Sequence, residues 1–221
     1  CIIRKSDGGF LYATTDLATI DHRVKTWNAD EIWYVVGAPQ QLHFRQVFAA
    51  SHRRGHATRM EHVAFGSILG PDGKMFKTRS GASVGLLEVI DEAIERSHAV
   101  VAERDGLTDT EKEEIAEAIG IGAVKYAELS QHRMTDYKFS WDKMLSLQGN
   151  TAPYLINAYV RTRSIFRKLE GNVEFAPKCE ITEDAERTLI MKLAQFGEAV
   201  HDVLNDFRPN LLAQYLFELA N

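Results

Sequence analysis

Two short apolar runs on either side of an amphipathic segment constrain the fold of this chain more than any other feature. The run at 31–36 is rich in β-branched and aromatic residues, which favours a buried strand of the parallel-sheet kind, and 60–65 is predicted to be the next strand. The segment 41–53 between them has apolar residues at helical spacing, and Gly55 ends the pattern. A strand–helix–strand unit of this length predicts parallel strands with a right-handed crossover in a doubly wound sheet. Ligands of such sheets bind beyond the carboxyl ends of the strands, so the chemistry is expected just after each strand.

A glycine-rich loop with closely spaced cations follows the second strand. The stretch 70–81 combines Gly and Pro with Lys74, Lys77 and Arg79. Such a loop either binds the negatively charged phosphate of a substrate or is a solvated loop with no functional role. It is not a Walker A loop, because the residue after Lys74 is methionine where Ser or Thr is required.

Polar side chains also lie near the ends of the other predicted elements. Tyr12 and Asp16 are four residues apart where an N-terminal hairpin leads into a helix, which Thr15 or Asp16 is expected to cap. Asp16 either has only this capping role or faces a cleft and holds an ammonium or guanidinium beside Tyr12. Gln40 and Gln41 follow the first strand, where they either recognise a polar ligand or are solvated residues at a helix start.

The composition argues against several classes of protein. The chain has 221 residues and a net charge of −5, which argues against a nucleic-acid binder that is basic overall but leaves room for local basic patches. Its two cysteines are too few for a disulfide framework or a zinc ribbon, so a reducing, cytoplasmic setting is expected. No apolar run approaches the roughly 18 residues of a membrane span.

His52 and His56 have the spacing of a metal pair but lack the Glu of the H-E-x-x-H pattern, so no metal site is predicted.

The remainder of the chain is predicted to be helical. Thr108 and Glu111 form the pattern of a capping box, and Asn150 or Thr151 is expected to cap a later helix after a boundary at 148–153. The apolar residues of that later helix, Tyr159 and Ile165 among them, are expected to face inward. A single long helix is expected from Thr182 to just before Pro209.

The helix after residue 153 also carries a set of basic side chains. They are Arg161, Arg163, Arg167 and Lys168. These side chains form either the solvated face of a bundle helix or a contact with an RNA backbone, where Arg and Lys neutralise phosphates.

Taken together and in this order, these elements resemble class I arginyl-tRNA synthetases. The resemblance runs over nearly the whole chain, and its specificity lies in the combination of stretches. These are Tyr12-Ala-Thr-Thr-Asp16-Leu-Ala, Val36-Gly-Ala-Pro-Gln-Gln-Leu-His-Phe44, Phe65-Gly-Ser-Ile-Leu-Gly-Pro-Asp-Gly-Lys-Met-Phe-Lys-Thr-Arg-Ser-Gly81, Asp136-Tyr-Lys-Phe-Ser-Trp-Asp-Lys-Met-Leu145 and Gly149-Asn-Thr-Ala-Pro-Tyr154.

The resemblance implies a fold that is α/β plus all-α. Residues 1–147 would form the second half of a Rossmann-like (HUP-type) parallel-sheet catalytic domain, including the loop 70–81 and connecting helices. Residues 148–221 would form part of an α-helical, DALR-type anticodon-binding domain. The absence of an initiator Met and the apolar helical pattern at the last residues indicate that both ends are cuts through a larger protein.

For arginine recognition, the resemblance implies roles for three residues. Tyr12 and Asp16 match the family's Y-x-x-x-D positions that hold the arginine substrate, with Asp16 facing a cationic group. Gln40 matches the family's arginine-contacting glutamine, with Gln41 as the alternative.

For ATP, the resemblance points to the cationic loop. Residues 74–78 match the class I K-M-S-K-S loop but have Phe76 and Thr78 in place of its serines. Lys74, Met75 and Lys77 are then expected to bind ATP, and the two lysines to act in catalysis.

The resemblance further implies the reaction and its participants. The arginine carboxylate attacks the α-phosphorus of ATP, pyrophosphate leaves, and the arginyl group moves to the terminal ribose of tRNA(Arg). Lys77, and secondarily Lys74, would stabilise the negative charge of the transition state. Mg²⁺ is expected to accompany ATP, with no prosthetic group, no membrane, and a monomeric protein. Because no H-I-G-H-type motif occurs in the sequence, residues 1–221 alone are not expected to aminoacylate.

Three other interpretations stay open at this point. The chain could be a non-catalytic RNA-binding relative that keeps the fold. It could be another class I synthetase or nucleotidyl transferase that uses the same loop. It could also be a purely structural α/β-plus-helical module. Retention of Tyr12, Asp16, Lys74 and Lys77 together argues against the first.

Overall fold

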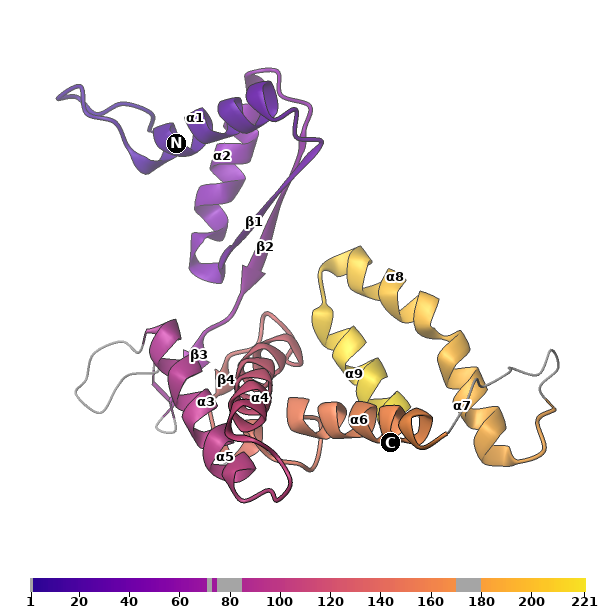
Figure 1. Ribbon diagram of the computed structural model, residues 1–221. Coiled ribbons are helices and arrows are strands. Elements are labelled where there is room, and N and C mark those ends of the chain that lie inside the picture. The colour runs from indigo at the N-terminus through magenta and orange to yellow at the C-terminus, as the bar shows by residue number, and fades with distance from the viewer. Residues whose placement is uncertain (1, 71–72, 75–84, 170–179) are drawn as a thin grey trace. The chain divides into compact units, whose positions relative to one another are not determined.

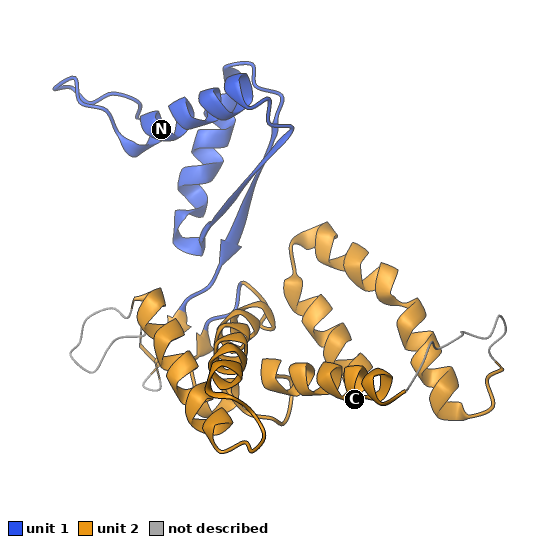
Figure 2. Cartoon of the chain, viewed as in Figure 1, with its two compact units in different colours: residues 1–67, 134–136 blue, residues 68–133, 137–221 orange. Residues whose placement is uncertain are grey.

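A computed structural model describes residues 2–70, 73–74, 85–169 and 180–221 (Figure 1). The chain divides into two compact units. Unit 1 comprises residues 1–67 with 134–136, and unit 2 comprises residues 68–133 with 137–221 (Figure 2).

Unit 1 contains the predicted strand–helix–strand arrangement. Strand β1 (Glu31–Gly37) leads through a short 3₁₀ turn, η1 (Ala38–Gln40), into helix α2 (Gln41–Arg53), and strand β2 (Arg59–Phe65) follows. The two strands are parallel and pair along their whole lengths. Both strands and the helix between them are therefore confirmed. Gly55 follows α2 with a φ of 93°, a left-handed backbone conformation that suits a residue without a Cβ atom.

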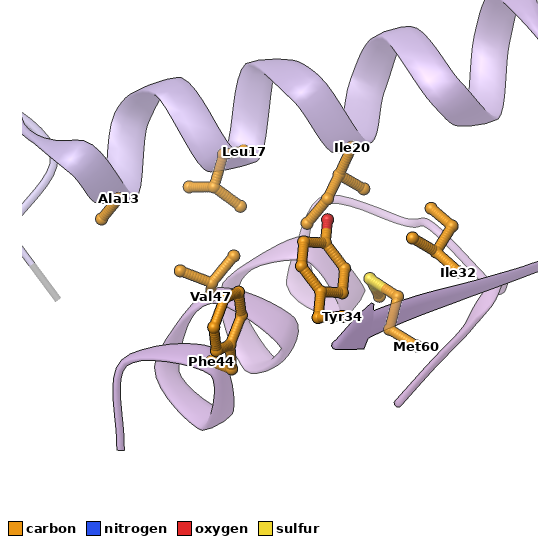
Figure 3. Packing of buried hydrophobic residues seen from close by; sticks show 8 residues of the cluster. All are labelled: Ala13, Leu17, Ile20, Ile32, Tyr34, Phe44, Val47 and Met60. Atoms are coloured by element: carbon orange, nitrogen blue, oxygen red, sulfur yellow. The ribbon is translucent and has the colours of Figure 1, made fainter. Parts of the chain in front are cut away.

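The core of unit 1 lies between helix α1 (Tyr12–Thr26), helix α2 and one face of the sheet (Figure 3). Helix α1 contributes Ala13, Leu17 and Ile20, whose spacing puts them on one side of the helix. The other members of the cluster are Ile32, Tyr34, Phe44, Val47 and Met60. Burial of each large apolar side chain contributes about 1.5–3 kcal/mol. The shared core therefore holds α1 firmly against α2.

The opposite face of β1 is exposed in the part of the chain that the structure describes. Trp33 and Val35 are 51% and 65% exposed, whereas Ile32 and Tyr34 are buried. The sequence-based expectation of a fully buried strand is therefore wrong for the described residues, because α1 and α2 pack on the same face of the sheet. An apolar run predicts a strand, but it does not show how many faces of the strand are covered.

Helix α1 begins earlier than the sequence suggests. The expected N-terminal hairpin is reduced to a single antiparallel bridge, and the helix starts directly after Leu11. Thr15 and Asp16 therefore lie inside the helix, and the expectation that one of them caps it is wrong. The Thr15 hydroxyl instead donates to the Tyr12 carbonyl at 2.8 Å. As a result, Tyr12 and Asp16 are one turn apart on the same helix.

Unit 2 is mostly helical. Its elements are β3 (Ile68–Leu69), α3 (Leu86–Ala102), α4 (Asp109–Leu129), β4 (Tyr137–Lys138), α5 (Trp141–Met144), α6 (Ala152–Lys168), α7 (Asp184–Ala194), α8 (Phe196–Asp206) and α9 (Pro209–Ala220). The short strands β3 and β4 pair in parallel. The predicted fold class, α/β followed by all-α, is confirmed.

Small residues allow α3 and α4 to pack closely. A Cβ atom at Gly120 of α4 would lie only 2.7 Å from the backbone nitrogen of Ile94 in α3. Ala93 and Ala123 are buried beside this contact. At the start of α4, Thr108 and Glu111 form the predicted capping box. The expected position and cap of this helix are therefore confirmed.

Helix α6 begins as predicted but does not bury the residues expected to face inward. The Thr151 hydroxyl accepts a hydrogen bond from the Tyr154 nitrogen at 3.3 Å, as a capping residue does. However, Tyr159 and Ile165 are 63% and 61% exposed. That part of the prediction is wrong, because burial in α6 is confined to its first residues, Ala152 and Pro153.

The long helix expected after Thr182 is two helices. Helices α7 and α8 are separated at Gln195, and Glu183 rather than Thr182 precedes the first turn of α7. Gly197 lies near the start of α8, and glycine in a helix interior costs roughly 1 kcal/mol relative to alanine. No residue of α7 or α8, both of which lie wholly in the described ranges, is buried.

Candidate functional site

Helix α1 carries the predicted tyrosine–aspartate pair along one side. Tyr12 and Asp16 are four residues apart, so their side chains lie on the same side of the helix. The Tyr12 side chain is 86% exposed, and that of Asp16 is 33% exposed. Their neighbours Ala13 and Leu17 belong to the core, so the pair borders the buried face of the helix. A phenol ring and a carboxylate on one rigid helix suit a cationic ligand.

The Asp16 carboxylate contacts a histidine from the neighbouring helix. His43 lies in the first turn of α2, and its Nε2 is 2.6 Å from Oδ2 of Asp16. This distance is short for a hydrogen bond from a nitrogen donor, and hydrogen bonds to ionised groups are shorter than those between neutral groups. The two side chains are about one-third exposed, at 33% for Asp16 and 30% for His43. The carboxylate is therefore oriented by the protein and still accessible to a ligand.

Sequence reasoning missed this pair, because the partner carboxylate is 27 residues away from His43 in the chain. The signal that could have found it is helical spacing. His43 precedes the buried Val47 by one turn, which places it on the side of α2 that faces the core and α1.

Tyr34 and Arg23 lie in the same electrostatic environment as Asp16. Burial raises the pKa of the Tyr34 phenol, the charge of Arg23 opposes this rise, and the Asp16 carboxylate adds to it. The Arg23 guanidinium carbon lies 5.4 Å from the centroid of the Tyr34 ring. Tyr34 therefore stays a neutral phenol at physiological pH, between a cation and an anion.

The two candidate glutamines lie at the carboxyl end of β1, as expected. Gln40 is the last residue of η1 and Gln41 is the first of α2. Both are exposed. The structure therefore gives no reason to prefer one of them over the other as a ligand contact.

The cationic loop is described only in part. Lys74 is exposed in unit 2, in a turn where the Gly70 nitrogen donates to the Lys74 carbonyl at 2.7 Å. Gly73 has a φ of 74°, which this turn requires and glycine tolerates. Met75 and Lys77 lie outside the described residues, so their expected roles remain predictions.

The basic residues of α6 are exposed. This group consists of Arg161, Arg163, Arg167 and Lys168. Arg163 and Arg167 are one turn apart and therefore project from the same side of the helix. Exposed guanidinium groups at this spacing can contact neighbouring phosphates of a nucleic acid.

Unit 2 also contains a cavity of about 450 Å³. It lies between α4, the β4–α5 segment and the residues just before α6, with Tyr126, Tyr137 and Asn150 in its lining. The Tyr126 hydroxyl donates to Asn150 and also, at 3.0 Å, to the Ala213 carbonyl. Burial and a hydrogen bond to Glu128 raise the pKa of Tyr137. These polar groups are thus committed to contacts within the unit.

The histidines considered as a metal pair bind protein groups. The His56 ring lies 2.9 Å from the Ser51 hydroxyl through Nδ1 and 3.2 Å from Asp21 through Nε2. His52 donates from Nδ1 to the His56 carbonyl at 3.0 Å. Over the described ranges, no group of three or more His, Cys, Asp and Glu side chains is placed to hold a metal ion. Among the helices in those ranges, none has both the length and the apolar character needed to cross a membrane.

Comparison with protein families divides the chain into two matches. Residues 1–141 match the family described as "tRNA synthetases class I (R), catalytic domain". Residues 155–221 match the "DALR anticodon binding domain".

Individual proteins give the same result. An arginine–tRNA ligase from Laribacter hongkongensis is 50% identical over 223 residues, which cover 99% of this chain and 39% of the relative. The crystal structure of the Plasmodium falciparum arginyl-tRNA synthetase matches 99% of the chain and 38% of its own, with 30% identity and a TM-score of 0.83. The Thermus thermophilus arginyl-tRNA synthetase matches 100% of the chain and 41% of its own, with 28% identity and a TM-score of 0.84. The chain thus spans about 39% of the length of the curated relative it matches.

Proposed function

This chain belongs to the class I arginyl-tRNA synthetase family, and from that membership we propose that it supplies the arginine-binding and anticodon-binding parts of an arginine–tRNA ligase. The observation that carries the proposal is the 50% identity to such a ligase over 99% of the chain. Because the chain spans only 39% of that relative, the complete reaction belongs to a polypeptide that also supplies the remainder of the catalytic domain.

The proposed reaction has two steps. The carboxylate of L-arginine attacks the α-phosphorus of ATP, forming arginyl-adenylate as pyrophosphate leaves. The arginyl group then passes to the terminal ribose of tRNA(Arg), and AMP is released. The protein contributes mainly by holding the reactants in line and by stabilising negative charge that develops on the phosphate oxygens.

Arginine recognition is assigned to α1 and the carboxyl end of β1. Asp16 accepts hydrogen bonds from the guanidinium, Tyr12 lies beside it on the same helix, and Gln40 or Gln41 contributes an amide. The partial exposure of Asp16 and its placement on a well-packed helix support this assignment. A site that pairs its acceptors with a guanidinium also rejects lysine and citrulline, because such analogues leave polar groups unpaired.

ATP binding is assigned to the loop that starts at Gly70. Lys74, Met75 and Lys77 would contact the nucleotide, with Lys77 and secondarily Lys74 stabilising the transferring phosphate group. Mg²⁺ would accompany ATP, since this ion usually binds through phosphate oxygens and waters with few protein carboxylates. No bound prosthetic group is expected.

Contact with tRNA(Arg) is assigned to the basic side chains of α6. Their exposure and the match of 155–221 to an anticodon-binding domain support this assignment. We place the boundary between the catalytic and anticodon-binding domains at residues 147 and 148. The protein is expected to be a cytoplasmic monomer.

The proposal is tested by amino-acid-dependent exchange of pyrophosphate into ATP. The full-length protein that contains these residues, supplied with tRNA(Arg), is compared across the standard amino acids. We expect exchange with arginine and little with lysine or citrulline. Preference for any other amino acid would refute the proposal and favour another class I synthetase. Complete absence of exchange, with tRNA binding retained, would favour a non-catalytic tRNA-binding relative.

The same assay on residues 1–221 alone tests whether this segment can catalyse the exchange without the remainder of the catalytic domain. We expect no arginine-dependent exchange, because the sequence holds no H-I-G-H-type motif for the other half of an ATP site. Detectable exchange by this segment would show that the motif is dispensable.

A further inference from the structure

We propose that His43 is a positioning residue for arginine. Its imidazole donates from Nε2 to Asp16 and fixes the carboxylate so that the remaining lone pairs face the guanidinium. The inference rests on the proposed function, because it takes Asp16 as the acceptor of the substrate cation.

The geometry gives His43 one specific task. Its Nε2 is 2.6 Å from Oδ2 of Asp16, and among the described residues no other group forms a hydrogen bond with Oδ1 of the same carboxylate. An ionised carboxylate has about four lone-pair sites, so one donated hydrogen bond does not saturate it. The imidazole thus fixes the orientation of the carboxylate without blocking its other oxygen.

The two residues lie next to buried residues of the unit 1 core. Leu17 follows Asp16 directly in α1 and is 2% exposed, and Val47, one turn after His43 in α2, is fully buried. Both belong to the same core cluster. The separation between the carboxylate and the imidazole is therefore set by the core and not by mobile loops. His43 also meets the Phe44 ring edge-on, with centroids 5.2 Å apart, which restricts the tilt of the imidazole.

Other polar groups near the pair have contacts of their own. Tyr34 from β1 is held neutral by burial. His62 from β2 packs on Phe44 with ring centroids 4.8 Å apart, and its Nε2 lies 2.9 Å from the Val36 carbonyl rather than against Asp16. His43 is therefore the neighbour that holds the carboxylate by a hydrogen bond.

The experiment measures the KM for arginine and kcat in the exchange assay with the full-length protein and tRNA(Arg). His43→Leu removes the donor. His43→Gln keeps an amide donor at a similar reach. His22→Gln, an exposed histidine of α1, is the matched control.

We expect His43→Leu to raise the KM roughly 10-fold with kcat nearly unchanged, because a charge-assisted hydrogen bond is lost. His43→Gln should stay within about threefold of the wild-type KM, since it restores the donor. His22→Gln should follow the wild type.

Two results would overturn the inference. One is an unchanged KM in His43→Leu. The other is a KM in His43→Gln that rises as far as in His43→Leu, which would assign the effect to packing and not to the donated hydrogen bond. If His43→Leu fails to fold by circular dichroism, His43→Phe, which keeps a ring and removes the donor, takes its place in the same comparison. A wild-type exchange reaction that does not depend on arginine would refute the proposed function itself, and the inference with it.

Discussion

The core of unit 1 and the helices α6 to α8 of unit 2 contain the same kinds of apolar residues, but these residues differ in burial. Ile20 and Val47 in unit 1 are fully buried. In the C-terminal helices, Ile165, Leu193 and Leu204 are 61%, 51% and 62% exposed. Both regions have apolar residues at helical spacing. The difference is that in unit 1 two helices and a sheet face share one core within about 50 residues of chain.

This contrast shows what amphipathic spacing does and does not specify. Spacing identifies which side of a helix is apolar, but it does not show whether another element covers that side. In unit 1 the short connections between α1, β1 and α2 bring the partners together. The candidate arginine-binding residues lie on this well-packed part, whereas the candidate tRNA-binding residues lie on an exposed helix.

The largest effect on stability is expected from truncating a large apolar side chain in the core of unit 1, compared with the same kind of change in an exposed helix of unit 2. Ile20→Ala should lower the free energy of unfolding of unit 1 by about 3 kcal/mol, because it leaves a cavity in a closed core. Leu193→Ala, the matched change in α7, should cost less than about 1 kcal/mol. The free energy of unfolding of both variants is measured by urea titration of the chain. The titration is followed by circular dichroism and by the fluorescence of Trp27 and Trp33 in unit 1. Equal losses would remove the contrast between the regions.

The same contrast explains how much could be predicted from the sequence. Strands β1 and β2, helix α2 and the Thr108 cap follow from local patterns, because alternation, turn residues and capping residues act within a few positions. The contact between Asp16 and His43 could not be predicted, since it depends on how α1 packs on α2. The open face of β1 at Trp33 was missed for the same reason, because coverage is a property of the assembled layers.

A second, smaller effect should separate the roles of the two regions. Arg163→Glu combined with Arg167→Glu should weaken tRNA(Arg) binding by the full-length protein about 10-fold, since two phosphate-facing cations are reversed. The KM for arginine should change little. Filter binding at fixed salt measures the affinity, and Arg104→Glu, an exposed arginine just after α3, is the control. An equal loss with the control would mean that net charge, and not the α6 surface, governs binding.

The smallest effect concerns the pH dependence of folding at α4. Hydrogen bonds from the Thr108 backbone nitrogen and hydroxyl, both at 2.8 Å, lower the pKa of Glu111. A carboxyl with a lowered pKa in the folded state stabilises the fold above its ordinary pKa. This stabilisation is lost as the pH falls through the lowered value.

Glu111→Gln keeps the capping hydrogen bonds but does not titrate. Its melting temperature should therefore fall less than that of the wild type between about pH 6 and pH 3. Glu113→Gln, at an exposed position of the same helix, should behave like the wild type. Identical acid sensitivity in all three proteins would mean that the capping box does not contribute to stability against acid.

Asp16 is the central residue of the proposed arginine site, as the acceptor of the arginine side chain. Asp16→Asn preserves the shape of the side chain and removes its charge, and Asp30→Asn makes the same change at an exposed position before β1. The direct measurement is kcat/KM for arginine in the exchange assay with the full-length protein. Asp16→Asn should lower it at least about 100-fold while Asp30→Asn leaves it within about twofold. A loss of less than about threefold in Asp16→Asn would contradict the assignment of the arginine site to α1.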